Sequence, residues 1–256
     1  MYNKTAYFRF YEELNDFLAE KQQKKMFAYY FKGTTTVKDS IEAIGVPHTE
    51  IDLILVNGIS VGFDCILRHE DRVSVYPVFE TFDISPLLRL RPESLRKPSF
   101  ILDVHLGKLA RIMRMLGFDT AYRNDYEDSE IIDISVKERK IILTRDMGIL
   151  KNRSVTHGYY LRSTDPNEQI SEVLKHFDLF AGINEFSRCI ICNGMIYETD
   201  RKSEAGSLPG SIANLHNKFW KCSECGKIYW RGSHYYKMKK EVEKFKINVS
   251  NDEKDI

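Results

Sequence analysis

The sequence lacks a long apolar run. No segment approaches the roughly 18 to 20 consecutive apolar residues that a membrane-spanning helix needs. The N-terminus, from Met1 to Thr5, does not lead into a hydrophobic stretch like that of a secretion signal. We therefore expect a cytoplasmic protein with no membrane partner.

The sequence also lacks an excess of charge of either sign. Its 38 basic and 37 acidic side chains leave a formal net charge of +1. This balance excludes a uniformly basic surface, so any face that binds a polyanion must be local.

Two common phosphoryl-transfer motifs are missing. There is no Gly-x-x-x-x-Gly-Lys-Ser/Thr loop, which argues against nucleotide hydrolysis of the P-loop type. The sequence Asp103-Val104-His105 lacks the second aspartate of the Asp-x-Asp motif used by aspartyl-phosphate phosphatases. Any phosphoryl chemistry must therefore use another arrangement.

Cysteine is scarce, but four of the five cysteines form two Cys-x-x-Cys pairs. A redox role is the alternative for either pair alone. Two pairs, separated by 29 residues, instead predict a closed tetrahedral site for structural Zn²⁺. The predicted ligands are Cys189, Cys192, Cys222 and Cys225, and we expect the glycine after each pair to relax its turn. Cys65 is expected to be an apolar filler.

Aromatic and β-branched residues dominate four predicted strands near the N-terminus, at 6–10, 26–31, 54–56 and 72–76. A helix is predicted at 36–44. With Val56-Asn57-Gly58 and the strand that ends at Pro77, this order over residues 1–83 resembles the β-grasp of ubiquitin-like sulfur carriers. Those carriers end in a free Gly-Gly tail, whereas here the chain continues. An interaction or packing domain with a possible protein partner is expected, and sulfur transfer is the alternative.

Residues 84–98, with three prolines among charged residues, are predicted to form a linker. Strands and helices then alternate over residues 99–182, which predicts a parallel-sheet α/β domain. A helix is expected to start at Pro166, with Asp165 as N-cap and Glu168 completing a capping box. The fold class predicted for the whole chain is therefore α/β and α+β multidomain.

Acidic residues follow two strands of this predicted sheet. Asp103 follows the strand at 100–102, and Asp146 follows the strand at 141–144. Carboxylates at neighbouring strand ends would face one crevice, where Mg²⁺ or Mn²⁺ relieves their repulsion. The connection between them carries a cluster of acidic residues, Asp125, Glu127, Asp128 and Glu130. For any single residue, a turn or helix cap is an equal alternative.

The residues from Phe100-Ile-Leu-Asp103 to Gly117-Phe-Asp-Thr120, followed by Ile142-Leu-Thr-Arg-Asp146, resemble the PIN-like RNase family named after the Mut-seven C-terminal domain. The resemblance covers about residues 99–235. It implies a metal-dependent ribonuclease with an N-terminal ubiquitin-like domain and a C-terminal zinc ribbon. It also implies Asp103, Asp128 and Asp146 as catalytic metal ligands, although Asp125 and Glu130 remain alternatives to Asp128. Thr144 and Arg145 match the Thr-Arg-Asp signature, with Thr144 expected to orient a carboxylate and both expected at the substrate.

Basic residues gather in two places. Lys108, Arg111 and Arg114 lie three apart on a predicted helix and are expected to hold the RNA backbone, with a solvated helix face as the alternative. Within the predicted ribbon and basic tail at 183–246, nine basic residues from Lys218 to Lys246 alternate with aromatic rings. This composition favours single-stranded nucleic acid, unless the rings mainly pack the ribbon. Residues 247–256 are expected to be disordered.

Two functions follow from the sequence. The first is a metal-dependent ribonuclease that hydrolyses RNA phosphodiester bonds. The second is a non-catalytic RNA- or ribosome-associated adaptor that uses the zinc ribbon and the β-grasp domain.

Overall fold

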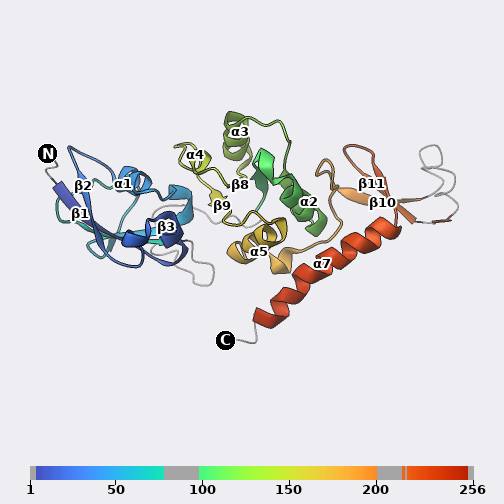
Figure 1. Ribbon diagram of the computed structural model, residues 1–256. Coiled ribbons are helices and arrows are strands. Elements are labelled where there is room, and N and C mark those ends of the chain that lie inside the picture. The colour runs from blue at the N-terminus through green and yellow to red at the C-terminus, as the bar shows by residue number, and fades with distance from the viewer. Residues whose placement is uncertain (1–3, 78–97, 201–214, 217, 253–256) are drawn as a thin grey trace. The chain divides into compact units, whose positions relative to one another are not determined.

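The computed structural model describes residues 4–77, 98–200, 215–216 and 218–252 (Figure 1). The chain forms two compact units. Unit 1 comprises residues 1–97, 135–138 and 144–160, and unit 2 comprises 98–134, 139–143 and 161–256. The predicted linker at 84–98 lies outside the described residues except for Pro98.

Unit 1 contains a five-stranded mixed sheet in the order β2-β1-β5-β3-β4. Its strands are β1 (Lys4–Phe10), β2 (Phe27–Phe31), β3 (Ile51–Val56), β4 (Ile59–Ser60) and β5 (Arg72–Pro77). Strand β1 pairs antiparallel with β2 and parallel with β5, as in a β-grasp. The N-terminal β-grasp fold is therefore confirmed.

The core of this sheet follows from alternation along β1. Ala6, Phe8 and Phe10 are buried, and the side chains between them face outward. Helix α1 (Val37–Ile44) adds Val37 and Ile41 to the same core. Three short 3-10 helices complete this region: η1 (Glu12–Phe17), η2 (Glu20–Gln22) and η3 (His48–Glu50).

A segment distant in sequence packs against the β-grasp within unit 1. This segment contains α4 (Met147–Leu150) and β9 (Gly158–Tyr160). The buried His48 ring lies 2.7 Å from the Glu42 carboxylate and 2.7 Å from the Val155 carbonyl oxygen. The Tyr160 N–H donates to the Glu50 carboxylate at 2.5 Å. The β-grasp domain and residues 144–160 therefore share polar contacts as well as a common unit.

Unit 2 is built on parallel strands. Strand β6 (Phe100–Leu102) pairs in parallel with β7 (Thr120–Ala121) and with β8 (Ile141–Thr144). All residues of β6 and β8 are buried, as expected for a sheet covered on both faces. The predicted parallel-sheet α/β class is confirmed.

Helices surround these strands in unit 2. They are η4 (Val104–Leu106), α2 (Gly107–Leu116), α3 (Asp128–Glu138), α5 (Pro166–His176) and η5 (Phe180–Gly182), and α3 extends into unit 1. Asp165 caps α5 as predicted, accepting from the N–H groups of Asn167 and Glu168. The Glu168 carboxylate accepts from the Ser163 hydroxyl instead of closing a capping box. That part of the prediction was wrong because a nearer hydroxyl is available.

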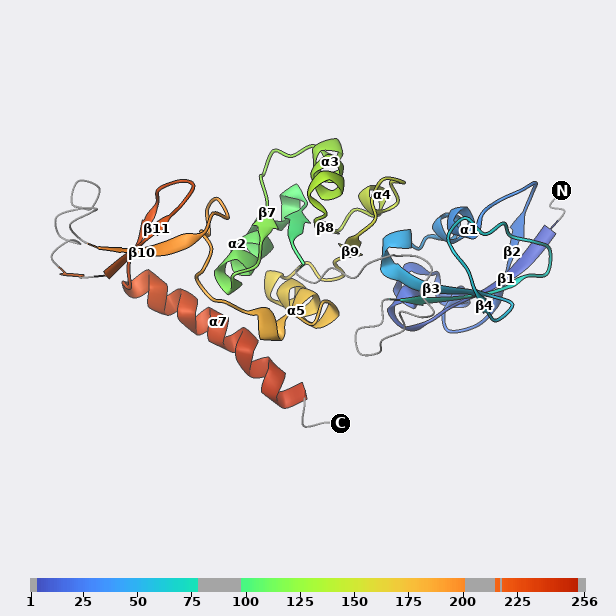
Figure 2. The ribbon, with the colours of Figure 1, turned by 180° about the vertical axis from the view of Figure 1, so that it is seen from behind.

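An antiparallel sheet and a long helix complete unit 2. The sheet contains β10 (Ile196–Asp200), β11 (Lys218–Cys222) and β12 (Ile228–Tyr229) in that order. Helix α7 (Ser233–Asp252) follows, and α2 packs against both α5 and α7 (Figure 2). Helix α7 continues to Asp252, within the tail that is predicted from the sequence to be disordered. Residues 253–256 lie outside the described part. Among described residues, no helix has the length and apolar character needed to cross a membrane.

Arg114 links α2 to the turn that carries the first cysteine pair. Its side chain is only 4% exposed, and its guanidinium donates to three carbonyl oxygens. The acceptors are those of Thr120 at 2.9 Å, Ile191 at 2.7 Å and Tyr122 at 3.3 Å. Ile191 lies between Cys189 and Cys192, so this one side chain joins the helix, strand β7 and the cysteine turn.

A second set of contacts supports the same junction. The Asn193 side chain accepts from the Thr120 N–H at 3.0 Å and donates to Asp119 at 2.8 Å. Asp119 also accepts from Lys140 at 3.0 Å and lies 3.4 Å from the Arg188 guanidinium. Despite its partial burial, these contacts hold the pKa of the Asp119 carboxyl below its usual range. The cysteine turn is thereby fixed to the parallel sheet.

We predict that Arg114→Gln lowers the free energy of unfolding by about 3 kcal/mol, because it leaves buried carbonyl oxygens unpaired. The control is Arg111→Gln, which removes an exposed guanidinium from the same helix. Denaturant titration of both variants measures the difference. Equal stability of the two would contradict the structural role of Arg114.

The Asp119 contacts predict an acid-sensitive contribution to stability. Because the folded-state pKa is depressed, the stabilisation is present above the unfolded pKa and is lost as pH falls through the folded value. Asp119→Asn is expected to cost about 1 kcal/mol at pH 7, a modest value because the carboxylate is partly exposed. Unfolding midpoints measured from pH 7 to pH 3 should converge for wild type and variant at the acid end. A difference in unfolding midpoint that stays constant from pH 7 to pH 3 would contradict a stabilising role for the Asp119 carboxylate.

Candidate metal centre and active site

Four cysteine side chains converge between the two turns of the C-terminal sheet. The Sγ atoms of Cys189, Cys192, Cys222 and Cys225 all lie within 4.8 Å of one another. The Cys189–Cys225 pair is separated by 3.7 Å and the Cys192–Cys222 pair by 3.3 Å. Zn–S bonds of about 2.3 Å place tetrahedral sulfurs about 3.8 Å apart, so the cluster fits one zinc ion.

Each cysteine pair lies on a hydrogen-bonded turn. The Cys189 N–H donates to the Gly194 carbonyl at 2.7 Å, and the Cys222 N–H donates to the Lys227 carbonyl at 3.0 Å. Gly226 has a φ of 69°, as predicted for the glycine after the second pair. In the first turn, Asn193 takes the left-handed conformation, with a φ of 73°. Gly194 is required for space, since a Cβ there would lie 2.8 Å from the Cys222 Sγ.

Tyr229 contributes to the cluster, although no pattern in the sequence linked it to the cysteines. Its hydroxyl lies 3.0 Å from the Cys189 Sγ. Burial acts to raise the pKa of Cys189, but this hydroxyl and the N–H groups of Cys192 and Ile191 outweigh it and lower the pKa to about 6. The Tyr229 hydroxyl is therefore in contact with one of the four predicted ligands.

The predicted catalytic aspartates occupy the ends of two neighbouring strands. Asp103 follows β6, is 6% exposed, and donates its N–H to the Leu143 carbonyl of β8 at 3.1 Å. Asp146 comes two residues after the end of β8 and is exposed. Its Oδ1 accepts from the Gly148 N–H at 2.6 Å, so it is the N-cap of α4. Within the described part of the chain, the cysteines alone form a group of three or more ligands at metal-binding distances.

The acidic residues near the start of α3 differ in their contacts. Asp125 is held by the Arg123 guanidinium through two contacts of 2.9 Å, which lower the pKa of its carboxyl. The Glu130 carboxylate accepts from the Glu127 N–H at 2.9 Å. Asp128 is the first residue of α3 and is exposed. Of these three, Asp128 remains the carboxylate with no contact recorded among the described residues.

The predicted substrate-binding residues do not share one environment. Lys108 and Arg111 are exposed and line a groove of about 940 Å³ in unit 2. Arg114 does not belong to this strip, because its guanidinium is buried against carbonyl oxygens. Thr144 is fully buried, and its hydroxyl accepts from the Asp146 N–H at 2.8 Å. It therefore positions the Asp146 backbone, and its predicted role at the substrate stays a prediction. Arg145 is half-buried.

We predict that the purified protein contains one zinc ion per chain and that Cys222→Ser loses it. Removing one of four thiolates opens the closed site and lowers its affinity for the ion. Elemental analysis after gel filtration measures the stoichiometry. Cys65→Ser is the control, because Cys65 lies outside the cluster, and it should keep its zinc. One zinc ion per chain in Cys222→Ser would contradict the assignment of Cys222 as a zinc ligand.

Comparison with known proteins assigns most of the chain to two family models. Residues 3–83 match the Mut7-C ubiquitin model, and residues 98–242 match the Mut7-C RNAse domain model. No curated protein and no solved structure matches the chain. The RNAse-domain match spans more than half of the sequence. The chain therefore belongs to the Mut7-C RNAse domain family and carries the ubiquitin-like domain named with it.

Proposed function

We propose that this protein is a metal-dependent ribonuclease whose site includes Asp103, Asp128 and Asp146. The observation that carries the proposal is the parallel pairing of β6 with β8, in register at Leu102 and Leu143. The chain leaves β6 at Asp103 and leaves β8 two residues before Asp146. Ligands gather at the carboxyl ends of parallel strands, and this pairing lies within the RNAse-domain match.

The proposed site uses oxygen donors, which suit Mg²⁺ or Mn²⁺. A bound ion of this kind would supply activation of water and neutralisation of charge on the phosphoryl oxygens. The chain contributes carboxylates that hold the ion. Asp146 has one carboxylate oxygen on the Gly148 N–H, which fixes its orientation, and Thr144 fixes its backbone.

Two cations on α2 suit the role of holding the RNA backbone. Lys108 and Arg111 are exposed on the helix that begins four residues after Asp103. A phosphate held there would lie along the helix that leads away from the carboxylate. The zinc site has a different role, because four thiolates leave no open position for water.

A non-catalytic adaptor is the second candidate function. It is favoured by one observation, which is that the described carboxylates do not form a ligand group at metal distances whereas the cysteines do. In that case the ribbon would bind RNA or a ribosomal surface, and the β-grasp domain would bind a protein. The two functions differ in whether the purified chain cuts RNA.

We predict that Asp103→Asn and Asp146→Asn each reduce Mn²⁺- or Mg²⁺-dependent cleavage of labelled single-stranded RNA by at least about a hundredfold. Asp128→Asn should also reduce it. Asp125→Asn is the matched control, since Asp125 is already paired with Arg123 and should cut normally. Circular dichroism and zinc content check that each variant is folded.

The adaptor would replace the ribonuclease under one set of results. Highly purified wild-type protein would cleave no RNA with Mg²⁺ or Mn²⁺. The Asp103→Asn and Asp146→Asn variants would bind RNA with the same affinity as the wild type. If Asp125→Asn loses cleavage and Asp128→Asn does not, the third metal ligand is Asp125 and not Asp128.

A further inference from the structure

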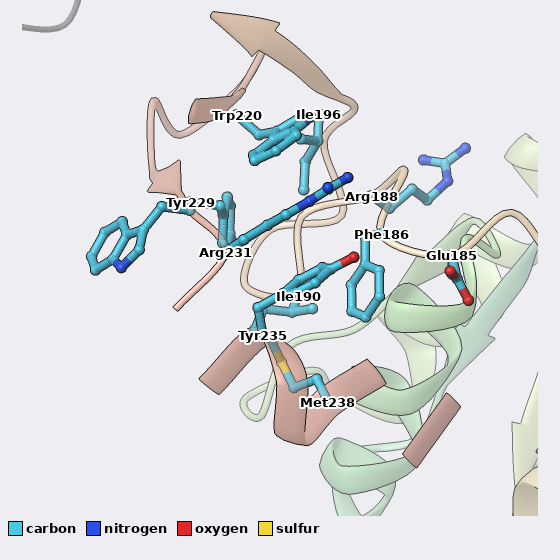
Figure 3. A pocket seen from close by; sticks show the side chains of 11 residues that line it. Glu185, Phe186, Arg188, Ile190, Ile196, Trp220, Tyr229, Arg231, Tyr235 and Met238 are labelled. Carbon is cyan, nitrogen blue, oxygen red and sulfur yellow. The ribbon is translucent and has the colours of Figure 1, made fainter. Parts of the chain in front are cut away.

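An aromatic cavity lies in unit 2 between the C-terminal sheet and the start of α7 (Figure 3). Its volume is about 240 Å³. Trp220 and Ile196 line one side, and Ile190, Phe186 and Tyr235 line the opposite side. The walls are therefore mostly aromatic rings and aliphatic side chains, and the cavity is large enough for one planar heterocycle.

Arg231 lies between the two walls of this cavity. Its guanidinium carbon is 5.0 Å from the centre of the Trp220 ring and 5.6 Å from that of the Tyr235 ring. Stacking of this kind holds the planar fork in place while its edge remains available. No hydrogen bond to the guanidinium is recorded among the described residues, and Arg231 is exposed. The cavity thus presents a stacked cation with N–H donors for an acceptor from outside.

The other charged groups of the cavity are already engaged. The Glu185 carboxylate accepts from Lys246 at 2.6 Å. The Arg188 guanidinium donates to the Asn193 carbonyl at 3.0 Å and lies 3.4 Å from Asp119. Arg231 is therefore the polar group of the cavity that is best placed to meet a ligand.

The cavity adjoins the groove that contains Lys108 and Arg111. The two hollows share Ile190, Tyr229, Trp230, Tyr235 and Met238 as lining residues. Lys227 and Lys237 add two further cations to the groove. Two carboxylates, Asp165 and Glu241, also line it, but Asp165 is occupied in capping α5. Four cations against two carboxylates leave the groove with a net positive charge, which favours a chain of phosphates.

We propose that the aromatic cavity binds one unstacked base of a single-stranded RNA, with the adjoining backbone held in the groove by Lys108, Arg111 and Lys237. The base stacks on the aromatic rings of the cavity wall, and its edge or neighbouring phosphate accepts from the exposed edge of the Arg231 guanidinium. This inference rests on the proposed ribonuclease function for the identity of the polymer. It adds that the substrate is single-stranded at this point.

The combination of groups favours a nucleic acid strand over its alternatives. In a duplex the base faces are covered by their neighbours, so a cavity for one ring suits a single strand. An acidic peptide would use the cations but would leave the stacked rings without a flat partner. A polyanion without bases would do the same.

Tryptophan emission gives a direct test, because both tryptophans of the chain, Trp220 and Trp230, line the cavity. In the Trp230→Phe variant, Trp220 is the remaining reporter. Titration is carried out without Mg²⁺ or Mn²⁺, so binding is read independently of cleavage. Short single-stranded RNA is expected to quench Trp220 saturably. Its blunt duplex, polyphosphate and polyglutamate are expected to leave the emission nearly unchanged.

Substitutions separate stacking from charge. Arg231→Gln and Arg231→Lys should each raise the Kd for single-stranded RNA about fivefold or more, because both lose the stacked fork. Lys240→Gln is the matched control, since it removes one charge from an exposed residue of α7 that does not line either hollow. It should change Kd by less than about twofold. Unchanged zinc content shows that the ribbon remains folded.

Several results would overturn the base-binding cavity. These are equal quenching by polyphosphate or duplex, RNA binding by anisotropy with no change in Trp220 emission, and normal RNA affinity in both Arg231 variants. Quenching by polyglutamate alone would assign the cavity to a protein partner. If RNA quenches Trp220 but is not cleaved when Mg²⁺ or Mn²⁺ is added, the ribonuclease function is refuted and the base-binding cavity is supported. If RNA is cleaved but does not quench Trp220, the base-binding cavity is refuted and the ribonuclease function is supported.

Discussion

The buried guanidinium of Arg114 determines how the parts of unit 2 fit together. It is fixed by carbonyl oxygens from the end of β7 and from the turn that bears Cys189 and Cys192. A buried cation is tolerated only when its donors are satisfied, so the cysteine turn and the parallel sheet must keep their relative position. The four cysteines converge from both turns, so a metal ion bound among them would fix the second cysteine turn to the first. Arg114 and such an ion would together make the ribbon an extension of the RNAse domain.

This arrangement brings binding groups from distant parts of the sequence into one groove. Lys108 and Arg111 come from α2, Lys227 follows the second cysteine pair, and Lys237 comes from α7. None of these cations would form a continuous path if the ribbon moved freely. The near-zero net charge of the chain is consistent with such a local basic surface. The two proposed metal sites would then have separate tasks, with structural zinc among the four cysteines and a catalytic ion at the strand ends.

Local patterns in the sequence were sufficient for the elements and for the zinc ligands. The alternation of apolar and polar residues predicted β1, and short apolar runs predicted β6 and β8. The two Cys-x-x-Cys pairs predicted the cysteine cluster. Arg114 was misassigned because spacing by three does not keep side chains on one helix face. At about 100° per residue, Arg114 lies about 120° around the helix from Lys108, towards the buried side. No local pattern in the sequence encodes tertiary packing. Three features depend on such packing: the stacking of Arg231 on Trp220, the contact of the Tyr229 hydroxyl with Cys189, and the contact of residues 144–160 with the β-grasp.

The strand ends of β6 and β8 are proposed to form a site for a divalent ion that is distinct from the cysteine cluster. Crystals of the protein soaked in Mn²⁺ test it through anomalous scattering, which distinguishes manganese from zinc. We expect a manganese peak bound by Asp103 and Asp146, with Asp128 as the third carboxylate, and a zinc peak among the four cysteines. Zinc in the cysteine cluster with no manganese at the aspartates, at ion concentrations that support RNA cleavage, would contradict it.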